Sequence, residues 1–327
     1  MHFFIKRIMK KIINAAIIFS LVYINNCSSI VEENDKPITQ PVDIIWSKTG
    51  LDSCWVYSMV FMDNGDLFAG TSCGLLFSAD SGTSWSVANQ VSFGTAACFY
   101  KQYTGRVFAG TSGQGLFTSS DNGISWNDLG LHNYNLTSIA VSSSGKVFVG
   151  TRGNGIFVAD SLNQEWEQAD INFQLQTFQS LLITDSNIIY AGGSGVYRSI
   201  DDGKNWSLKN QGLGNWPVQS LIVDNFGNIC AGTDYGGFFI SSNNGESWTK
   251  LNDGLTNTEI TSLVINNEGY IFAGTWKGGV FRSINNGLKW EKVDSLLTMN
   301  QISSLIISED QHIFAGTIRG IFKAATN

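Results

Sequence analysis

A short motif, Ala-Gly-Thr or a close variant, recurs seven times along the chain at intervals of 40 or 42 residues. Its glycines are Gly70, Gly110, Gly150, Gly192, Gly232, Gly274 and Gly316. A column of tryptophans keeps step with them: Trp46, Trp85, Trp126, Trp166, Trp206, Trp248 and Trp290. Self-similarity at this period indicates one supersecondary unit copied around or along an axis. The repeat therefore constrains the architecture strongly and the ligand very little.

One copy of the repeat shows what the unit is. Short segments that are apolar, β-branched or alternating predict four strands, at residues 260–265, 270–275, 280–283 and 289–293. Asn285 and Gly287 tolerate positive φ and predict a tight hairpin between the last two. Four short antiparallel strands in about 40 residues are the content of one propeller blade. We therefore predict an all-β, seven-bladed β-propeller over residues 42–327, with four antiparallel strands per blade.

The two ends of the repeat region are complementary. The chain stops just after a predicted third strand at 320–323, so the last blade lacks its fourth strand there. The segment 43–48 carries Trp46, the first member of the tryptophan column, and no glycine motif precedes it. We predict that this N-terminal strand completes the last blade, which removes two free sheet edges and closes the ring.

The turn between the third and fourth strands carries a further motif. Three copies fit Ser-x-Asp-x-Gly-x-x-Trp in full, with Asp80, Asp121 and Asp201 as the acid, and two copies replace the acid by Asn243 or Asn285. This pattern resembles the Asp-box (BNR) repeat of sialidases, sortilin-type receptors, xyloglucan-cleaving hydrolases and photosystem II assembly-factor propellers. The resemblance covers the chain from about residue 43 to its end. It implies the propeller fold and leaves the activity open, because functions within this fold diverge widely.

The residue types of this turn indicate a structural role. The Asp or Asn oxygen can accept backbone N–H groups, the glycine supplies the unusual φ, and the tryptophan is expected to be buried between blades. A calcium site is a poor alternative, because each turn offers one carboxylate whereas calcium takes six to eight oxygen ligands. We predict no metal and no cofactor.

The N-terminus has the features of an export signal. Four cations, Lys6, Arg7, Lys10 and Lys11, precede an apolar run at 12–24 that is too short for a stable spanning helix. Cys27 follows, and bacterial lipoproteins are cleaved before such a cysteine, which then carries the lipid. We predict a lipoprotein signal peptide at 1–26, a lipid anchor on Cys27, a flexible tether at 27–41 and a location in the bacterial cell envelope. Ordinary secretion with cleavage near Ser28 is the alternative.

The charge of the chain limits the classes of partner it can bind, and its cysteines bear on the cellular compartment. The chain has a net charge of −7, and removing the four cations of residues 1–26, which contain no acid, leaves −11. An acidic shell argues against nucleic acid as a partner. Cys98 and Cys230 fall in strand columns and are expected in the core. Cys54 and Cys73 flank the first blade on one predicted face and could pair in an oxidising compartment, although spacing does not define connectivity.

Aromatic residues outside the tryptophan column map to one face of the predicted ring. The loops that enter each inner strand, and those between second and third strands, lie opposite the Asp-box turns, and related propellers place their sites there. Trp55, Trp216 and Trp276 map to this face, as do Phe93, Tyr134, Phe173 and Tyr235. Such aromatics suit sugar stacking or protein contact, or they merely plug the channel. The predicted ligand-binding residues are Trp55, Tyr134, Arg152, Trp216, Asp234, Tyr235, Trp276, Lys277 and Arg319.

No catalytic set is evident in the sequence. A sialidase needs three arginines around a carboxylate, and only Arg152 and Arg319 lie in loops of the predicted ligand face. A glycoside hydrolase needs two carboxylates at a defined separation, which sequence does not show. The acids on or near that face are Asp52, Asp170, Asp234, Asp253, Glu259 and Asp294. We predict a non-catalytic scaffold that binds protein or glycan, with a sialidase-like hydrolase or lyase of divergent site as the alternative.

Overall fold

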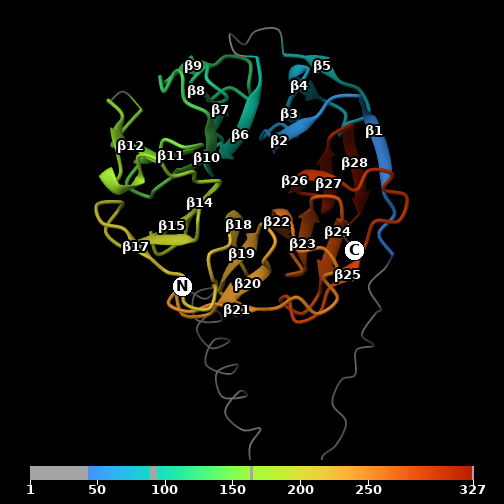
Figure 1. The fold of residues 1–327 in the computed structure, drawn as a ribbon. Coiled ribbons are helices and arrows are strands. Elements are labelled where there is room, and N and C mark those ends of the chain that lie inside the picture. The colour runs from blue at the N-terminus through green and yellow to red at the C-terminus, as the bar shows by residue number, and fades with distance from the viewer. Residues whose placement is uncertain (1–42, 89–93, 163–164, 326–327) are drawn as a thin grey trace, which may run out of the picture. The chain divides into compact units, whose positions relative to one another are not determined.

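The computed structural model describes residues 43–88, 94–162 and 165–325 (Figure 1). They form seven four-stranded antiparallel sheets, one per blade, which confirms the predicted all-β, seven-bladed propeller. The only helical element among these residues is a single 3₁₀ turn, Ile171–Phe173. The predicted signal peptide at 1–26, the tether at 27–41 with Cys27, and Phe93 lie outside the described residues.

Each blade runs from its first strand, which faces the channel, to its fourth at the rim. Blade one has β2 (Val56–Phe61), β3 (Leu67–Thr71), β4 (Gly74–Ser78) and β5 (Ser86–Val87), and blade two has β6 (Ala96–Lys101), β7 (Val107–Thr111), β8 (Leu116–Ser119) and β9 (Asn127–Asp128). Blade three has β10 (Leu136–Val141), β11 (Val147–Thr151), β12 (Ile156–Ala159) and β13 (Glu167–Gln168). Blade four has β14 (Ser180–Ile183), β15 (Ile189–Gly192), β16 (Val196–Ser199) and β17 (Ser207–Leu208).

The remaining blades repeat this pattern. Blade five has β18 (Val218–Val223), β19 (Ile229–Thr233), β20 (Gly237–Ser241) and β21 (Thr249–Lys250), and blade six has β22 (Ile260–Ile265), β23 (Ile271–Thr275), β24 (Gly279–Ser283) and β25 (Glu291–Lys292). Blade seven has β26 (Ile302–Ile307), β27 (His312–Thr317), β28 (Gly320–Ala325) and β1 (Ser47–Asp52). The fourth strand predicted at 289–293 is thus only two residues long, because it is an exposed edge and the tryptophan before it leaves the ladder to pack inward.

The N-terminal strand closes the ring, as predicted. β1 lies beside β28 in Figure 1, with Ser47 opposite Lys323 and Lys48 opposite Phe322. Trp46 precedes this strand, is 1% exposed, and donates its indole N–H to the carbonyl of Val293 at 2.6 Å. The first strands contact one another in cyclic order, including β2 with β26. The two ends of the chain's repeat region therefore share one blade, and no blade edge remains open at the junction.

Hydroxyls on the first strands link neighbouring blades. Ser180, Ser220 and Ser262 each accept a hydrogen bond at 3.0 Å from the backbone N–H of a leucine on the next first strand: Leu221, Leu263 and Leu305. These bonds satisfy polar groups that the ring would otherwise bury unpaired. Cys98 stands in the same column and Cys230 in a second strand, and both are buried as expected. Burial raises the pKa of the Cys98 thiol to about 12, so it is an inert core residue.

Candidate ligand-binding face

The turns between third and fourth strands use their acids internally. Asp80 accepts hydrogen bonds from the backbone N–H of Ser84 and the hydroxyl of Ser78, both at 2.8 Å, while its second oxygen accepts from the Ser84 hydroxyl at 2.7 Å. These bonds, led by that of the Ser84 hydroxyl, lower the pKa of Asp80 to about 2. Equivalent contacts are made by Asp121, Asp201, Asn243 and Asn285. The side-chain oxygens are therefore committed to holding the turn, which supports a structural role.

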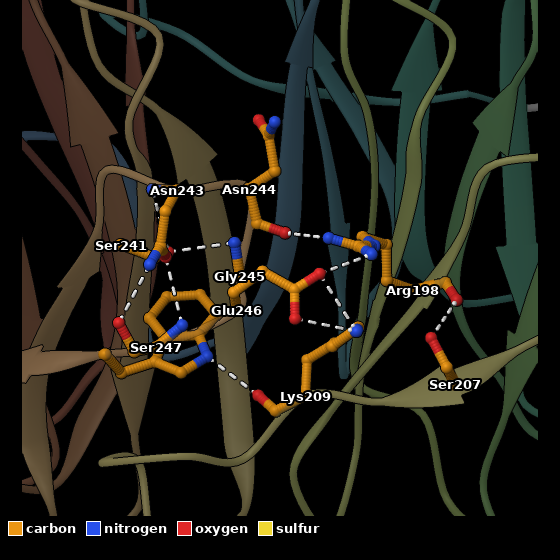
Figure 2. A network of polar contacts seen from close by, with 10 residues as sticks. Arg198, Ser207, Lys209, Ser241, Asn243, Asn244, Gly245, Glu246 and Ser247 are labelled. Atoms are coloured by element: carbon orange, nitrogen blue, oxygen red, sulfur yellow. Dashed lines mark hydrogen bonds and ion pairs between the residues drawn. The ribbon is translucent and has the colours of Figure 1, made fainter.

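One of these turns is also fixed to the blade before it (Figure 2). Glu246 accepts from Arg198 at 2.7 Å and from Lys209 at 2.9 Å, and Arg198 donates to the carbonyl of Asn244 at 2.6 Å. Arg282 pairs with Glu291 at 2.6 Å within blade six. Two of the five arginines that follow the predicted signal peptide are thus used in structural ion pairs. Within the described parts of the chain, no group of three His, Cys, Asp or Glu side chains could hold a metal ion.

The opposite face brings together aromatic residues from three blades. Trp55 lies in the connection that enters blade one, and its ring centroid is 6.1 Å from that of Trp276, in the turn after β23 of blade six. Trp55 also lies 5.4 Å from Tyr57 on β2. Trp216 enters blade five and lies over Gly236, where an added Cβ would be 2.6 Å from its ring. We call Trp55, Trp216, Tyr235 and Trp276 the aromatic platform.

The platform residues remain accessible although they are held in place. Trp55 and Trp216 are 40% and 39% exposed, and Tyr235 is 59% exposed. Glycine at position 236 is required because any side chain would displace the Trp216 ring. Large, partly exposed rings fixed by close backbone contacts are suited to binding, since little side-chain freedom is lost when a ligand docks.

A disulfide anchors the platform in blade one. Cys54 and Cys73 are bonded, with Cα atoms 5.8 Å apart, so the pairing left open by the sequence is present. The backbone N–H of Trp55 donates to the Ser72 hydroxyl at 3.0 Å, and the Cys54 carbonyl accepts from Gly320 at 2.8 Å. The bridge therefore joins the loop that carries Trp55 to the turn after β3, beside the point where blade seven closes.

Two carboxylates lie within the platform. The backbone N–H of Trp276 donates to the carbonyl of Glu259 at 2.9 Å, and Asp234 precedes Tyr235 in the turn after β19. Partial burial and then the negative charge of Glu259 raise the pKa of Asp234. The charges of Glu259 and Asp234 in turn raise the pKa of Tyr235. The backbone N–H of Gly237 donates to the carbonyl of Thr258 at 3.1 Å, so the turn that carries Asp234 and Tyr235 lies beside the segment that carries Glu259. Glu259, one of the loop acids of the sequence, therefore lies beside the predicted ligand-binding residues, although the predicted set omitted it.

Two platform turns adopt a backbone conformation that large residues rarely take. Tyr235 has a φ of 65° and Lys277 a φ of 71°. Blades two and three have Gly113 and Gly153 at the corresponding place, two residues after the strand threonine, with φ of 93° and 82°. The left-handed region costs a side-chain-bearing residue roughly 1–2 kcal/mol. Tyr235 and Lys277 are kept despite this conformational cost, although glycine occupies the same position in blades two and three. They are therefore candidates for a functional role.

The other predicted residues lie apart from this cluster or pack into the fold. The ring of Tyr134 lies 4.6 Å from Phe157, and Phe173 is buried against Phe178 at 4.8 Å. Arg152 is exposed in the turn after β11 of blade three, and Arg319 is exposed between β27 and β28 of blade seven. Blade seven lies between blades six and one, so Arg319 is next to the platform blades. Blade three is not a platform blade, so Arg152 lies apart from the platform.

Comparisons with known proteins place the fold and leave the activity open. No protein-family model matches the chain, and no curated protein sequence matches it. The extracellular domain of a putative one-component system from B. thetaiotaomicron is similar, with a TM-score of 0.73 and 18% identity over 87% of this chain. This chain spans only 40% of the length of that domain. YCF48 bound to D1 peptide has a TM-score of 0.68 and 14% identity, covering 88% of this chain and 98% of the other.

A glycoside hydrolase is also among the similar structures. The GH74 enzyme of Niastella koreensis has a TM-score of 0.67 and 14% identity over 85% of this chain, which spans 44% of that enzyme. Within the residues described, no helix has the length and apolar character needed to cross a membrane. At these identities the likeness shows the fold alone: the chain forms a seven-bladed propeller of the kind found in peptide-binding, extracellular and sugar-cleaving proteins.

Proposed function

We propose that this chain is an exported, lipid-anchored propeller of the Asp-box type that binds protein or glycan without catalysis. The observation that carries the proposal is the gathering of Trp55, Trp216 and Trp276 on one face. Every other tryptophan belongs to the repeat column. Exposed aromatics that the repeat does not require, fixed by a disulfide and by close glycine contacts, have the properties of interface anchors.

The kinds of similar structure agree with this assignment in outline. One of them is an extracellular domain and another is bound to a peptide. The Cys54–Cys73 bond is typical of an oxidising compartment and supports export. The turns built on Asp80, Asp121, Asp201, Asn243 and Asn285 share one internal hydrogen-bond pattern, which supports membership of the Asp-box propellers.

Binding should be tested by screening the full chain on glycan and peptide arrays and then measuring variants against the best hit. Trp216→Ala and Trp276→Ala should each weaken binding by roughly 1–3 kcal/mol, as hot-spot residues do. Tyr103→Ala is the matched control, because Tyr103 is a fully exposed aromatic in the turn between β6 and β7, on the opposite face. Normal binding by both tryptophan variants, together with loss in the Tyr103 variant, would show that the site lies on the opposite face and would contradict the proposal.

The lipid anchor is tested separately from binding. Cys27→Ser should release the protein from the membrane fraction into the soluble fraction, and mass spectrometry of the wild type should find a lipidated cysteine at the mature N-terminus. A Cys27→Ser protein that stays in the membrane fraction, or a mature N-terminus elsewhere, would rule out the anchor. Ordinary secretion predicts release of both proteins.

A hydrolase remains the second candidate because of one feature. Partial burial and then the negative charge of Glu259 raise the pKa of Asp234, and a carboxyl pair with one member more easily protonated is what glycoside hydrolysis uses. Asp234→Asn should then abolish turnover of xyloglucan oligosaccharides or sialosides while leaving the melting temperature unchanged. Absence of turnover by the wild type on both substrate classes would favour the binding scaffold.

A further inference from the structure

The acids of the aromatic platform, Asp234 and Glu259, have no cationic partner, unlike two other acids on the same face. Asp52 pairs with Lys48 at 2.7 Å, and Asp294 pairs with Lys292 at 2.7 Å. Across the described ranges of the chain, no lysine or arginine forms an ion pair with Asp234 or Glu259. Their segments lie side by side, because the backbone N–H of Gly237 donates to the carbonyl of Thr258 at 3.1 Å. Two neighbouring carboxylates without a cation repel, and a positive ligand group between them would remove that repulsion.

The surrounding rings add to this preference for positive charge. Trp216 lies over Gly236 beside Tyr235, and the backbone of Trp276 is bonded to that of Glu259. Indole and phenol faces attract cations, by roughly 0.5–2 kcal/mol for each well-placed pair. Both ring types are accessible here, and both lie next to the unpaired carboxylates.

A positive charge lies in one of the turns that carry the platform. Lys277, exposed in the turn after β23, is the basic residue of the two strained turns that carry the platform. Its ammonium would repel a positive ligand, so the site is not uniformly acidic. This gives a test with an opposite sign, because removing Lys277 should strengthen cation binding while removing an acid should weaken it.

Resting on the proposed binding function, we propose that the platform recognises a cationic peptide, whose lysine ammonium or arginine guanidinium lies between Asp234 and Glu259 against the rings of Trp216, Tyr235 and Trp276. Neutral sugar would stack on the same rings but would leave the two carboxylates unneutralised. Charge complementarity therefore selects a basic polypeptide segment over a neutral glycan.

Three probes separate the proposal from its alternatives. The full chain is titrated calorimetrically with an amidated hexapeptide of alternating glycine and lysine, with its glycine–glutamate counterpart, and with cellohexaose. The lysine peptide should bind, and the Asp234→Asn/Glu259→Gln double variant should bind it roughly tenfold more weakly. Lys277→Ala should bind it at least as tightly as the wild type.

A second double variant controls for the net charge of the protein. Glu268→Gln/Glu309→Gln removes the same charge from exposed acids in the turns between first and second strands, on the opposite face. It should bind the lysine peptide within about twofold of wild type, because these acids lie far from the platform blades' ligand loops. Equal weakening in the two double variants would show that only general negative charge attracts the peptide and would overturn the inference.

The remaining outcomes distinguish this inference from the proposed function. One outcome is that the protein binds cellohexaose or the glutamate peptide but not the lysine peptide, and that Trp216→Ala weakens this binding. That outcome would support the proposed binding face and would contradict the proposal of a cationic ligand. Lysine-peptide binding that neither Trp216→Ala nor Trp276→Ala affects would overturn both. Thermal melting of each variant checks that the fold is intact, and Tyr235→Gly, which restores the residue used in blades two and three, should bind more weakly without loss of stability.

Discussion

Blades one, two and four differ from the other four blades in where the repeat tryptophan places its indole N–H. In the first group the indole donates to the glycine carbonyl of its own turn, at 3.0–3.1 Å: Trp85 to Gly82, Trp126 to Gly123 and Trp206 to Gly203. In the second group it donates to a backbone carbonyl of the preceding blade: Trp46 to Val293, Trp166 to Leu129, Trp248 to Lys209 and Trp290 to Leu251.

Burial follows this division in six of the seven blades. Trp46, Trp248 and Trp290 are buried, whereas the three tryptophans bonded to their own turns are only partly buried. Trp166 is the exception, because it bonds to the preceding blade but is only partly buried. The expectation that the whole column is buried between blades is therefore too broad. A single conserved spacing in the repeat supports two packing arrangements, and only one of them locks neighbouring blades together through an indole hydrogen bond.

The loop that leaves the preceding blade builds the deeper slot. Gly212 and Gly254 have φ of 83° and 79°, and a Cβ on either would lie 2.2 or 2.1 Å from the carbonyl oxygen of Trp248 or Trp290. The leucines that follow, Leu213 and Leu255, are buried in the same clusters as these tryptophans. The comparison teaches that the position of a repeat tryptophan depends on the backbone path of its neighbour's loop and not on its own turn.

The prediction with the largest expected effect removes Trp46, one of the tryptophans bonded to the preceding blade, together with part of the closing strand. Deleting residues 43–48 should cost on the order of 5 kcal/mol or more, since it takes away Trp46 and the part of β1 that pairs with Lys323 and Phe322, which exposes that end of the β28 edge. Size-exclusion chromatography should show aggregates, and thermal melting should lose its cooperative transition. A soluble deletion protein with an unchanged melting temperature would show that the terminal strand does not close the ring.

Single tryptophan replacements should separate the two groups directly. Trp290→Ala should lower the free energy of unfolding by about 3–5 kcal/mol, as for other fully buried aromatics. Trp126→Ala should cost about 1–3 kcal/mol, because part of that ring is already in water. Urea denaturation measures the free energy of unfolding of both variants. Equal losses would contradict the distinction between the two tryptophan packing arrangements.

Glycine replacements test whether the loop builds the slot. Gly254→Ala places a Cβ 2.1 Å from the Trp290 carbonyl oxygen, so the loop must shift. Gly227→Ala has nearly the same φ, 83°, with nothing within 4 Å, and should show only the backbone cost of roughly 1–2 kcal/mol. A clearly greater loss of stability in the Gly254 variant supports the loop mechanism, and similar losses in both would contradict it.

The smallest expected effect concerns Asp80, Asp121 and Asp201, the acids of the Asp-box turns. They lie in blades one, two and four, the blades whose tryptophan bonds to its own turn. The pKa of Asp80 is lowered from 3.8 to about 2 by hydrogen bonds from Ser84 and Ser78, and those of Asp121 and Asp201 are also lowered. The stability from these ionised groups is fully present above their ordinary pKa and is lost as pH falls through the lowered values. The triple change of Asp80, Asp121 and Asp201 to Asn should flatten the fall in melting temperature between about pH 4 and pH 2. Asn285→Asp should steepen it, and an unchanged slope in both proteins would exclude the effect.

Local pattern predicted the parts of this protein that depend on one repeat at a time. The four-stranded unit, the number of blades and the terminal closure follow from periodic apolar segments and turn residues, because these set backbone conformation over a few residues. The face that carries Trp55, Trp216 and Trp276 also followed, since the order of strands in a blade fixes which loops share a side. The length of the fourth strands did not, because an edge strand is decided by packing and exposure.

The sequence by itself determined the period, the blade content and the side of the ring on which each loop lies. Only the tertiary structure decided which residues meet: that Trp55 lies 6.1 Å from Trp276, that Cys54 bonds Cys73, and that Gly237 bonds the carbonyl of Thr258, the residue before Glu259. The dipeptide Gly50-Leu51 shows the reason. It matches Gly254-Leu255 in sequence, yet Gly50 lies within β1, held against β28, and lacks the left-handed φ that builds a tryptophan slot. Pairing with a strand some 270 residues away in sequence overrides the local preference, because ring closure supplies hydrogen bonds that the dipeptide does not encode.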